Sequence, residues 1–286
     1  MSILSKFINW QSGLYLADFI KCDLLKTTYN EIWIELPVGY KIYAHIHNPV
    51  ELRKYPGIVI VPGANSPGTD YDKGTGLKAA DLASCGFSVI HYDPSGRGKT
   101  GGNEDYWGRV HQEELSCVIN YFSKLPTVKE DNIGILSFSI GIIIASGAQA
   151  RFPMPNVKYI FDWEGPSNRF NTTKNNTHRP LRNFPTSKND FWNEREASGF
   201  IGGIKCGYFR YQAEIDHIQG SYKGHAIELL NNATKGNTSW TKCNDNPINI
   251  FFNENKVQEY NWIPSRLNHK GQILKYLLEL QKDRFV

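Results

Sequence analysis

ILSFSIGIII, residues 135–144, joins a run of apolar residues to a segment rich in small residues. The first half predicts a buried strand, and the second half predicts a helix. Ser139 lies at the junction, with the small residues Ser137 and Gly141 two positions away on either side. A sharp strand-to-helix turn of this kind presents a serine hydroxyl at the carboxyl edge of a sheet. Ser139 is therefore the candidate nucleophile, and the Ile140 N–H at the start of the helix is a candidate oxyanion donor.

Strand-like and helix-like segments alternate on both sides of this turn. The expected strands are 31–36, 40–47, 57–63, 87–93, 132–139, 157–165, 208–216 and 248–255. The expected helices are 77–85, 106–125, 141–150, 224–232 and 270–281. Alternation of this kind predicts an α/β fold, with a mostly parallel sheet of about eight strands and helices on both faces.

Two segments depart from the alternation. Residues 1–29 precede the first strand and are expected to form an N-terminal extension to a single domain of residues 30–286. The polar stretch at about 167–203 is long for a plain connection, and connections of that length usually carry function. We expect this stretch to be an insertion that forms a cap.

A glycine cluster at 92–102, YDPSGRGKTGG, raises the alternative of a nucleotide site because it contains Gly98-Lys99-Thr100. A phosphate-binding P-loop needs another glycine five positions before Gly98, where this chain has Asp93. A carboxylate at that place would repel phosphate. The cluster also fits G-x-G-x-x-G, but a dinucleotide site needs a helix directly after it, and here the loop continues. The sequence therefore disfavours nucleotide binding.

Composition excludes several classes of partner. The chain has 286 residues, of which 40% are hydrophobic, and its formal net charge is +4. No basic block points to nucleic acid, and no apolar run reaches the ~18 residues of a membrane span. The five cysteines form no CxxC motif, so we expect them to be reduced thiols. The N-terminal residues contain no apolar signal-peptide core, so we expect a cytoplasmic location. The sequence leaves open whether the protein forms a homo-oligomer.

Over residues 30–283 the sequence resembles serine hydrolases of the α/β-hydrolase superfamily. The resemblance rests on the Ser139 turn, on the turn Val61–Asn65 and on Asp93-Pro94-Ser95-Gly96-Arg97-Gly98. It implies that the Ala64 N–H is the second oxyanion donor. It also implies that the glycine cluster is a structural loop near the active site, which Arg97 anchors.

The resemblance also implies an acid and a histidine that follow the serine along the chain. Asp216, at the end of 208–216, is the expected acid. Asp162 and Glu164, one strand earlier, are the alternatives. His269 is the expected base because it follows the last expected strand and precedes the last helix.

The expected reaction is hydrolysis of an acyl compound, a carboxylic ester or a thioester, through an acyl-enzyme. Two alternatives remain: a small-peptide hydrolase of the dipeptidyl-peptidase type, and a binding protein without catalysis on the same fold. The expected partner is a small-molecule acyl substrate, and the reaction needs no organic cofactor and no metal. Residues expected near the substrate are Asn65, Phe138, Glu164, Trp192 and His217.

Overall fold

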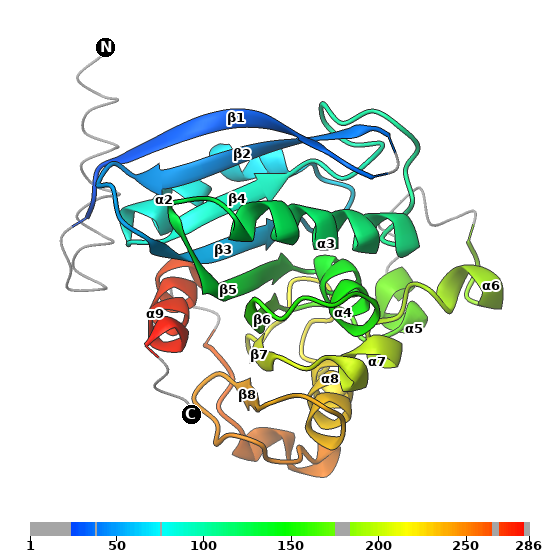
Figure 1. The fold of residues 1–286 in the computed structure, drawn as a ribbon. Helices are drawn as coiled ribbons and strands as arrows, with labels where there is room; N and C mark the ends of the chain where they lie inside the picture. Colours follow the sequence, from blue (N-terminus) through cyan, green and yellow to red (C-terminus); the bar gives the residue numbers. More distant parts are fainter. Residues whose placement is uncertain (1–23, 38, 75, 175–183, 265–268, 283–286) are drawn as a thin grey trace.

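A computed structural model describes residues 24–37, 39–74, 76–174, 184–264 and 269–282 of the chain. Its eight strands form one sheet in the order β1-β2-β4-β3-β5-β6-β7-β8, which Figure 1 shows from β1 at the top to β8 at the bottom. The strands are β1 Thr27–Glu35, β2 Lys41–Pro49, β3 Tyr55–Val61, β4 Ser88–Tyr92, β5 Val128–Phe138, β6 Val157–Trp163, β7 Gly207–Tyr211 and β8 Thr241–Cys243. The expected α/β sheet of about eight strands is confirmed.

The sheet is antiparallel at one edge and parallel elsewhere. β2 pairs antiparallel with both β1 and β4, while the pairs from β4–β3 through to β7–β8 are parallel. The carboxyl ends of β3, β5, β6 and β7 therefore lie along the same edge of the sheet. In open parallel sheets this is the edge at which ligands bind.

Helices cover both faces. The longer ones are α2 Ala79–Ser84, α3 Arg109–Ser123, α4 Gly141–Arg151, α8 Gly224–Lys235 and α9 His269–Gln281. One core cluster joins α3, α4 and α8 to the sheet, and a second cluster joins α2 and α9 to it. Along β3, Ile58 and Ile60 belong to the second cluster, whereas Val59 and Val61 belong to the first. This alternation explains why the strand reads as continuously apolar.

Short elements fill the connections near the carboxyl edge. The 3-10 helix η1, Gly68–Asp72, follows β3. Between β6 and β7 the described residues form α5 Arg169–Thr173, α6 Asn189–Trp192, α7 Ala197–Phe200 and the 3-10 helix η4 Ile201–Gly203. These four elements occupy the stretch for which the sequence predicts a cap.

Two sequence predictions need correction or restriction. Residues 248–255 do not form the last strand: the last described strand is β8, and residues 254 and 255 begin the 3-10 helix η5, Glu254–Glu259. Most of the expected N-terminal extension lies outside the described residues, and β1 already begins at Thr27.

Candidate active site

Three residues at the carboxyl edge have backbone angles that are unfavourable for side chains larger than glycine. Ala64, Ser139 and Glu164 follow β3, β5 and β6, with φ of 47°, 50° and 51°. Such left-handed conformations cost energy in non-glycine residues and cluster at functional sites. All three positions were singled out from the sequence.

The turn at Ser139 is packed too tightly for larger neighbours. A Cβ on Gly141 would lie 2.9 Å from the carbonyl oxygen of Pro62, and one on Gly63 would lie 2.8 Å from that of Phe138. Ser137 stands in the strand, fully buried, and its hydroxyl donates to the carbonyl of Phe161 at 3.3 Å. A small residue suffices at 137, whereas glycine is needed at 63 and 141.

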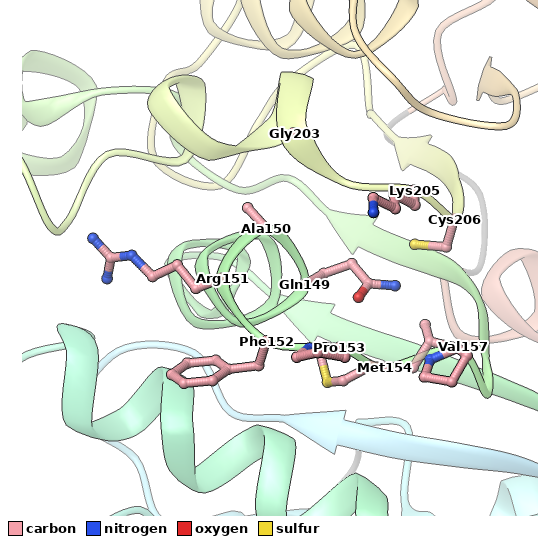
Figure 2. A pocket seen from close by; sticks show the side chains of 11 residues that line it. Gln149, Ala150, Arg151, Phe152, Pro153, Met154, Val157, Gly203, Lys205 and Cys206 are labelled. Atoms are coloured by element: carbon pink, nitrogen blue, oxygen red, sulfur yellow. The ribbon is translucent and has the colours of Figure 1, made fainter.

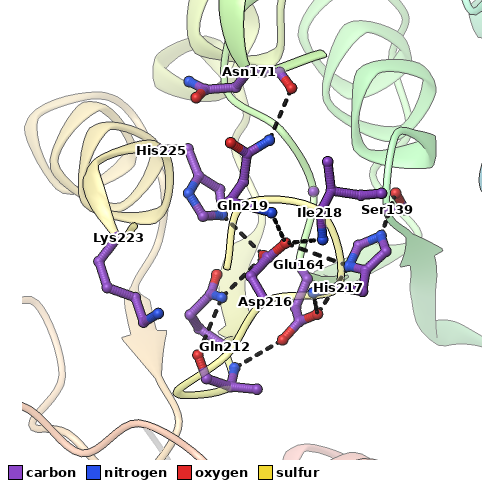
Figure 3. A network of polar contacts seen from close by, with 12 residues as sticks. Ser139, Glu164, Asn171, Gln212, Asp216, His217, Ile218, Gln219, Lys223 and His225 are labelled. Carbon is purple, nitrogen blue, oxygen red and sulfur yellow. Dashed lines mark hydrogen bonds and ion pairs between the residues drawn. The ribbon is translucent and has the colours of Figure 1, made fainter. Parts of the chain in front are cut away.

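Ser139, His217 and Glu164 form a continuous hydrogen-bonded relay (Figure 3). Nε2 of His217 lies 2.9 Å from the Ser139 Oγ. Nδ1 of His217 lies 2.9 Å from Oε2 of Glu164. Because a carboxylate only accepts, Nδ1 carries a proton, and in the neutral imidazole Nε2 then presents its lone pair to the serine hydroxyl. This is the tautomer that a general base for Ser139 requires.

Glu164 is held rigidly at the end of β6. Its Oε1 accepts a hydrogen bond from the Ala213 N–H at 2.9 Å, and its Oε2 accepts from the His217 N–H at 3.2 Å. Its own N–H donates to the Tyr211 carbonyl at 3.1 Å. The Trp163 ring packs against the imidazole of His217, with centroids 4.5 Å apart. These contacts fix both partners of the relay.

Asp216 organises the loop that carries His217. Its Oδ1 accepts hydrogen bonds from the N–H groups of Ile218 and Gln219 at 2.7 Å each, and its Oδ2 lies 3.2 Å from Nε2 of His225. Burial raises the pKa of Asp216, but the contacts with His225 and the two backbone N–H groups outweigh burial, so its pKa is lowered overall. Its Oδ1 is 3.6 Å from Nδ1 of His217, which exceeds hydrogen-bonding distance. The expected acid is therefore a neighbour of the relay, and the alternative acid Glu164 makes the contact.

The other alternative acid, Asp162, is engaged elsewhere. Its Oδ2 accepts from Nη1 of Arg210 at 2.5 Å and from the Tyr208 hydroxyl at 2.7 Å, and its Oδ1 accepts from the Gly165 N–H at 3.0 Å. The ion pair with Arg210 is completely buried. Asp162 is thus a structural carboxylate that joins β6 to β7.

The structure corrects the expected position of the base. His269 begins α9, and its Nδ1 lies 2.7 Å from the Tyr211 hydroxyl. His217, which follows β7, occupies the place beside Ser139 that His269 was expected to fill. The expectation that the histidine follows the last strand is wrong: His217 precedes β8, the last described strand, whereas His269 follows it.

Hydrogen bonds from Arg97 and Trp107 hold the turn after β3 in place. The carbonyl of Ala64 accepts from Nη1 of Arg97 at 3.1 Å and from Nε1 of Trp107 at 2.8 Å. Arg97 is itself held by Glu104 at 2.7 and 2.8 Å. Within the described residues, the N–H groups of Ala64 and Ile140 have no hydrogen-bond acceptor. Both donors are thus available to a ligand, and Arg97 anchors the turn as the resemblance implied.

No family model and no curated protein matches the sequence. Solved structures do match the fold. Dipeptidyl peptidase 4 of Porphyromonas gingivalis has a TM-score of 0.68 at 15% identity, over 90% of this chain but only 35% of the peptidase. An esterase of Pyrococcus furiosus has a TM-score of 0.59 at 13% identity, over 90% of both chains. Acetyl xylan esterase 1 of Thermoanaerobacterium has a TM-score of 0.59 at 13% identity, over 97% of this chain and 92% of the esterase.

The chain has the α/β-hydrolase fold. The single, mostly parallel eight-stranded sheet with helices on both faces agrees with these matches. The chain spans about a third of the length of the peptidase, so that similarity concerns one part of a larger protein.

Within this fold, the residues expected near the substrate separate into two groups. Phe138 lies between Tyr71 and Trp163, at centroid distances of 4.9 and 5.9 Å, and forms an aromatic wall beside Ser139. Oδ1 of Asn65 is buried and has no hydrogen-bond partner among the described residues.

Trp192, in contrast, is completely buried in α6, and its Nε1 donates to the Pro185 carbonyl at 3.0 Å. It packs edge-to-face on Phe191, which stacks on Phe184. Trp192 was expected in the substrate pocket, but it lies in the core of the insertion, where its indole is hydrogen-bonded and shielded from solvent.

A cavity of about 540 Å³ lies at the far end of α4 from the relay (Figure 2). Gln149, Ala150 and Arg151, at the carboxyl end of α4, line it together with Lys205 and Cys206. Ser139 precedes the amino end of this helix, roughly 15 Å away at 1.5 Å per residue. This cavity is therefore separate from the relay.

None of the helices in the described part of the chain has the length and hydropathy needed to cross a bilayer.

Proposed function

We propose that the protein is a serine hydrolase that cleaves a carboxylic ester or thioester through an acyl-enzyme on Ser139. The observation that carries the proposal is the relay from Ser139 through His217 to Glu164, with two distances of 2.9 Å. A serine hydroxyl is a weak nucleophile near neutral pH, and such a relay is the usual means of activating it.

The steps follow from the geometry. His217 removes the proton from Ser139 as the hydroxyl attacks the acyl carbon, and Glu164 stabilises the imidazolium that forms. The N–H groups of Ile140 and Ala64 would bind the oxyanion. His217 then protonates the leaving group, and a water molecule, activated by the same histidine, releases the acyl group. Asp216, 3.6 Å from Nδ1 of His217, adds a second negative charge behind the imidazolium.

The insertion between β6 and β7 is proposed to cap this site. Nε2 of Gln219 donates to the Asn171 carbonyl at 2.8 Å, and Nζ of Lys174 donates to the Gln219 carbonyl at 3.3 Å. Asn171 and Lys174 belong to the insertion, while Gln219 lies two residues from His217 (Figure 3 shows the first contact). The insertion and the histidine loop are thus tied together, which supports a role of the insertion in substrate selection.

The deciding experiment is labelling with a fluorophosphonate probe, followed by peptide mass spectrometry. Wild-type protein is expected to carry the label on Ser139, and Ser139→Ala is expected to lose both the label and roughly a million-fold in turnover. Ser137→Ala is the matched control, because Ser137 lies two residues before Ser139, in β5, and its hydroxyl is buried and bonded to Phe161. It should still be labelled. Folded wild-type protein that stays unlabelled would favour the alternative of a binding protein without catalysis.

Small peptides are the second substrate class, because one structural match is a dipeptidyl peptidase. Peptide and ester substrates compared side by side would separate the two. The proposal predicts the higher kcat/KM for esters, and faster cleavage of dipeptide substrates would replace it with a peptidase.

A further inference from the structure

A second cluster of ionisable side chains surrounds Asp72, the last residue of η1. Oδ2 of Asp72 lies 2.6 Å from Nδ1 of His45, and its Oδ1 lies 2.9 Å from Nε2 of His47 and 2.7 Å from Nε2 of His91. The four candidate ligand atoms all lie within 4.8 Å of one another. Three imidazoles thus converge on one carboxylate.

Strand geometry explains the convergence. His45 and His47 are two residues apart on β2, so their side chains share one face of the strand. His91 on β4 is the direct cross-strand partner of His45. The side chains of His45, His47 and His91 are only 8%, 7% and 0% exposed, and that of Asp72 is 20% exposed. The three imidazoles are therefore buried within the fold, and Asp72 is the most accessible residue of the cluster.

The hydrogen bonds of Tyr43 determine the form of His45. The Tyr43 hydroxyl donates its single proton to Glu31, and it accepts from Nζ of Lys99 at 2.6 Å. Nε2 of His45, 2.7 Å from the same hydroxyl oxygen, must therefore be a donor. In neutral His45 the lone pair then lies on Nδ1 and points at Asp72. A lone pair facing a carboxylate oxygen at 2.6 Å is repulsive, so this contact needs either a second proton on His45 or a metal ion between the two atoms.

We propose that His45, His47, His91 and Asp72 bind a divalent transition-metal ion of the Zn²⁺ class. The ligand atoms are Nδ1 of His45, Nε2 of His47 and His91, and a carboxylate oxygen of Asp72. Tetrahedral Zn²⁺ takes such nitrogen and oxygen ligands at about 2.0–2.1 Å, which places the ligands roughly 3.4 Å apart. Small outward movements of the imidazoles reach this geometry. Three nitrogen ligands disfavour Mg²⁺ and Ca²⁺, which prefer all-oxygen sites.

The surroundings suit such an ion. The contact between His45 and Tyr43 is the kind of outer hydrogen bond that orients a ligating imidazole. Tyr29 stacks on His47, with centroids 5.5 Å apart. A cavity of about 560 Å³, lined by His45, His47 and Asp72 among others, gives an entry path from solvent.

The ion would fasten η1 to the edge of the sheet. Asp72 is next to Tyr71, whose ring lies 4.9 Å from that of Phe138, the residue before Ser139. η1 also follows the Ala64 turn directly. We therefore expect the ion to stabilise the fold and the oxyanion side of the relay, without itself touching the substrate.

The test is a zinc titration of full-length protein from which any histidine tag has been removed. After treatment with a chelator, wild-type protein should bind one equivalent of Zn²⁺ in competition with a chromophoric chelator. Zinc at a hundredfold excess over Kd should raise the Tm by at least about 3 °C. His47→Ala and Asp72→Asn should each weaken binding by about a hundredfold or more. Two variants are used because one substitution alone could impair folding, which circular dichroism will check.

His217→Asn is the matched control, because Glu164, Asp216 and His217 are the other described group that could hold a metal. It should bind Zn²⁺ as tightly as wild type. The proposal is overturned if folded wild-type protein binds no stoichiometric Zn²⁺, if binding persists in both His47→Ala and Asp72→Asn, or if His217→Asn abolishes it. The last result would move the metal to the relay.

Discussion

Nδ1 of His217 donates a hydrogen bond to Oε2 of Glu164 across 2.9 Å, although the two residues come from the ends of different strands. Asp216, adjacent to His217 in sequence, reaches the same nitrogen only at 3.6 Å. Two carboxylates thus face one imidazole, but only one is bonded to it. Glu164 therefore orients the imidazole through a hydrogen bond, whereas Asp216 acts on it only through its charge.

The two carboxylates should respond differently to neutral substitution. Glu164→Gln keeps the shape but offers an amide where Nδ1–H needs an acceptor, so kcat should fall by about 10³–10⁴-fold. Asp216→Asn keeps the Oδ1 acceptor for the Ile218 and Gln219 N–H groups and should cost about tenfold, equivalent to ~1.4 kcal/mol. Steady-state hydrolysis of p-nitrophenyl acetate measures both. A larger loss in Asp216→Asn than in Glu164→Gln would reverse the assignment.

The tight turn at Ser139 predicts a stability effect. A Cβ on Gly141 would lie 2.9 and 3.0 Å from the Pro62 and Val61 carbonyl oxygens, and backbone atoms cannot move aside cheaply. Gly141→Ala should lower the free energy of unfolding by about 1–3 kcal/mol in urea denaturation and should also reduce kcat. Gly199→Ala is the control, since Gly199 is exposed in α7 with open space around its Cβ position. Its stability should be unchanged or up to about 1 kcal/mol higher. Equal losses in both variants would contradict the account of the turn.

His111 predicts a pH dependence of stability. Its Nδ1 accepts from the Trp107 N–H at 3.2 Å and its Nε2 lies 3.0 Å from the Ser95 carbonyl, so both nitrogens are satisfied in the neutral ring. Burial, followed by the nearby Arg97 charge, lowers the pKa of His111 to about 4. Between about pH 6.5 and 4 the unfolded chain therefore binds a proton that the folded chain does not. Stability falls as the pH is lowered through this window, by roughly 3 kcal/mol at most.

Urea unfolding of wild type and His111→Gln between pH 7 and 4.5 checks this prediction. The variant should have a lower free energy of unfolding than wild type at pH 7. The difference between the two should narrow as the pH falls, because only wild type loses stability by keeping residue 111 unprotonated in the folded state. A gap that is independent of pH would show that His111 does not contribute to acid sensitivity.

The sequence predicted what is local. The strand, turn and helix around Ser139 are predicted because they lie within ten residues. Arg97 is predicted to anchor the loop, and it does so by donating to the Ala64 carbonyl. The sequence assigns His217 only as a substrate contact, because the base is expected after the last strand, whereas His217 lies between β7 and β8. Its position beside Ser139 is set by tertiary contacts, which the order of residues along the chain does not reveal. The residues of the proposed metal site could not be assembled from the sequence either. His45 and His47 share a strand face by their spacing, but His91 joins them only through the register of β2 and β4, and Asp72 only through the position of η1.

The central claim is that His217 activates Ser139. The most direct measurement compares the rate of fluorophosphonate labelling, and kcat/KM for p-nitrophenyl acetate, in wild type, His217→Asn and His269→Asn. The account predicts that His217→Asn loses at least about a thousandfold in both quantities, while His269→Asn stays within about threefold of wild type. A folded His217→Asn that retains activity, together with loss in His269→Asn, would contradict it.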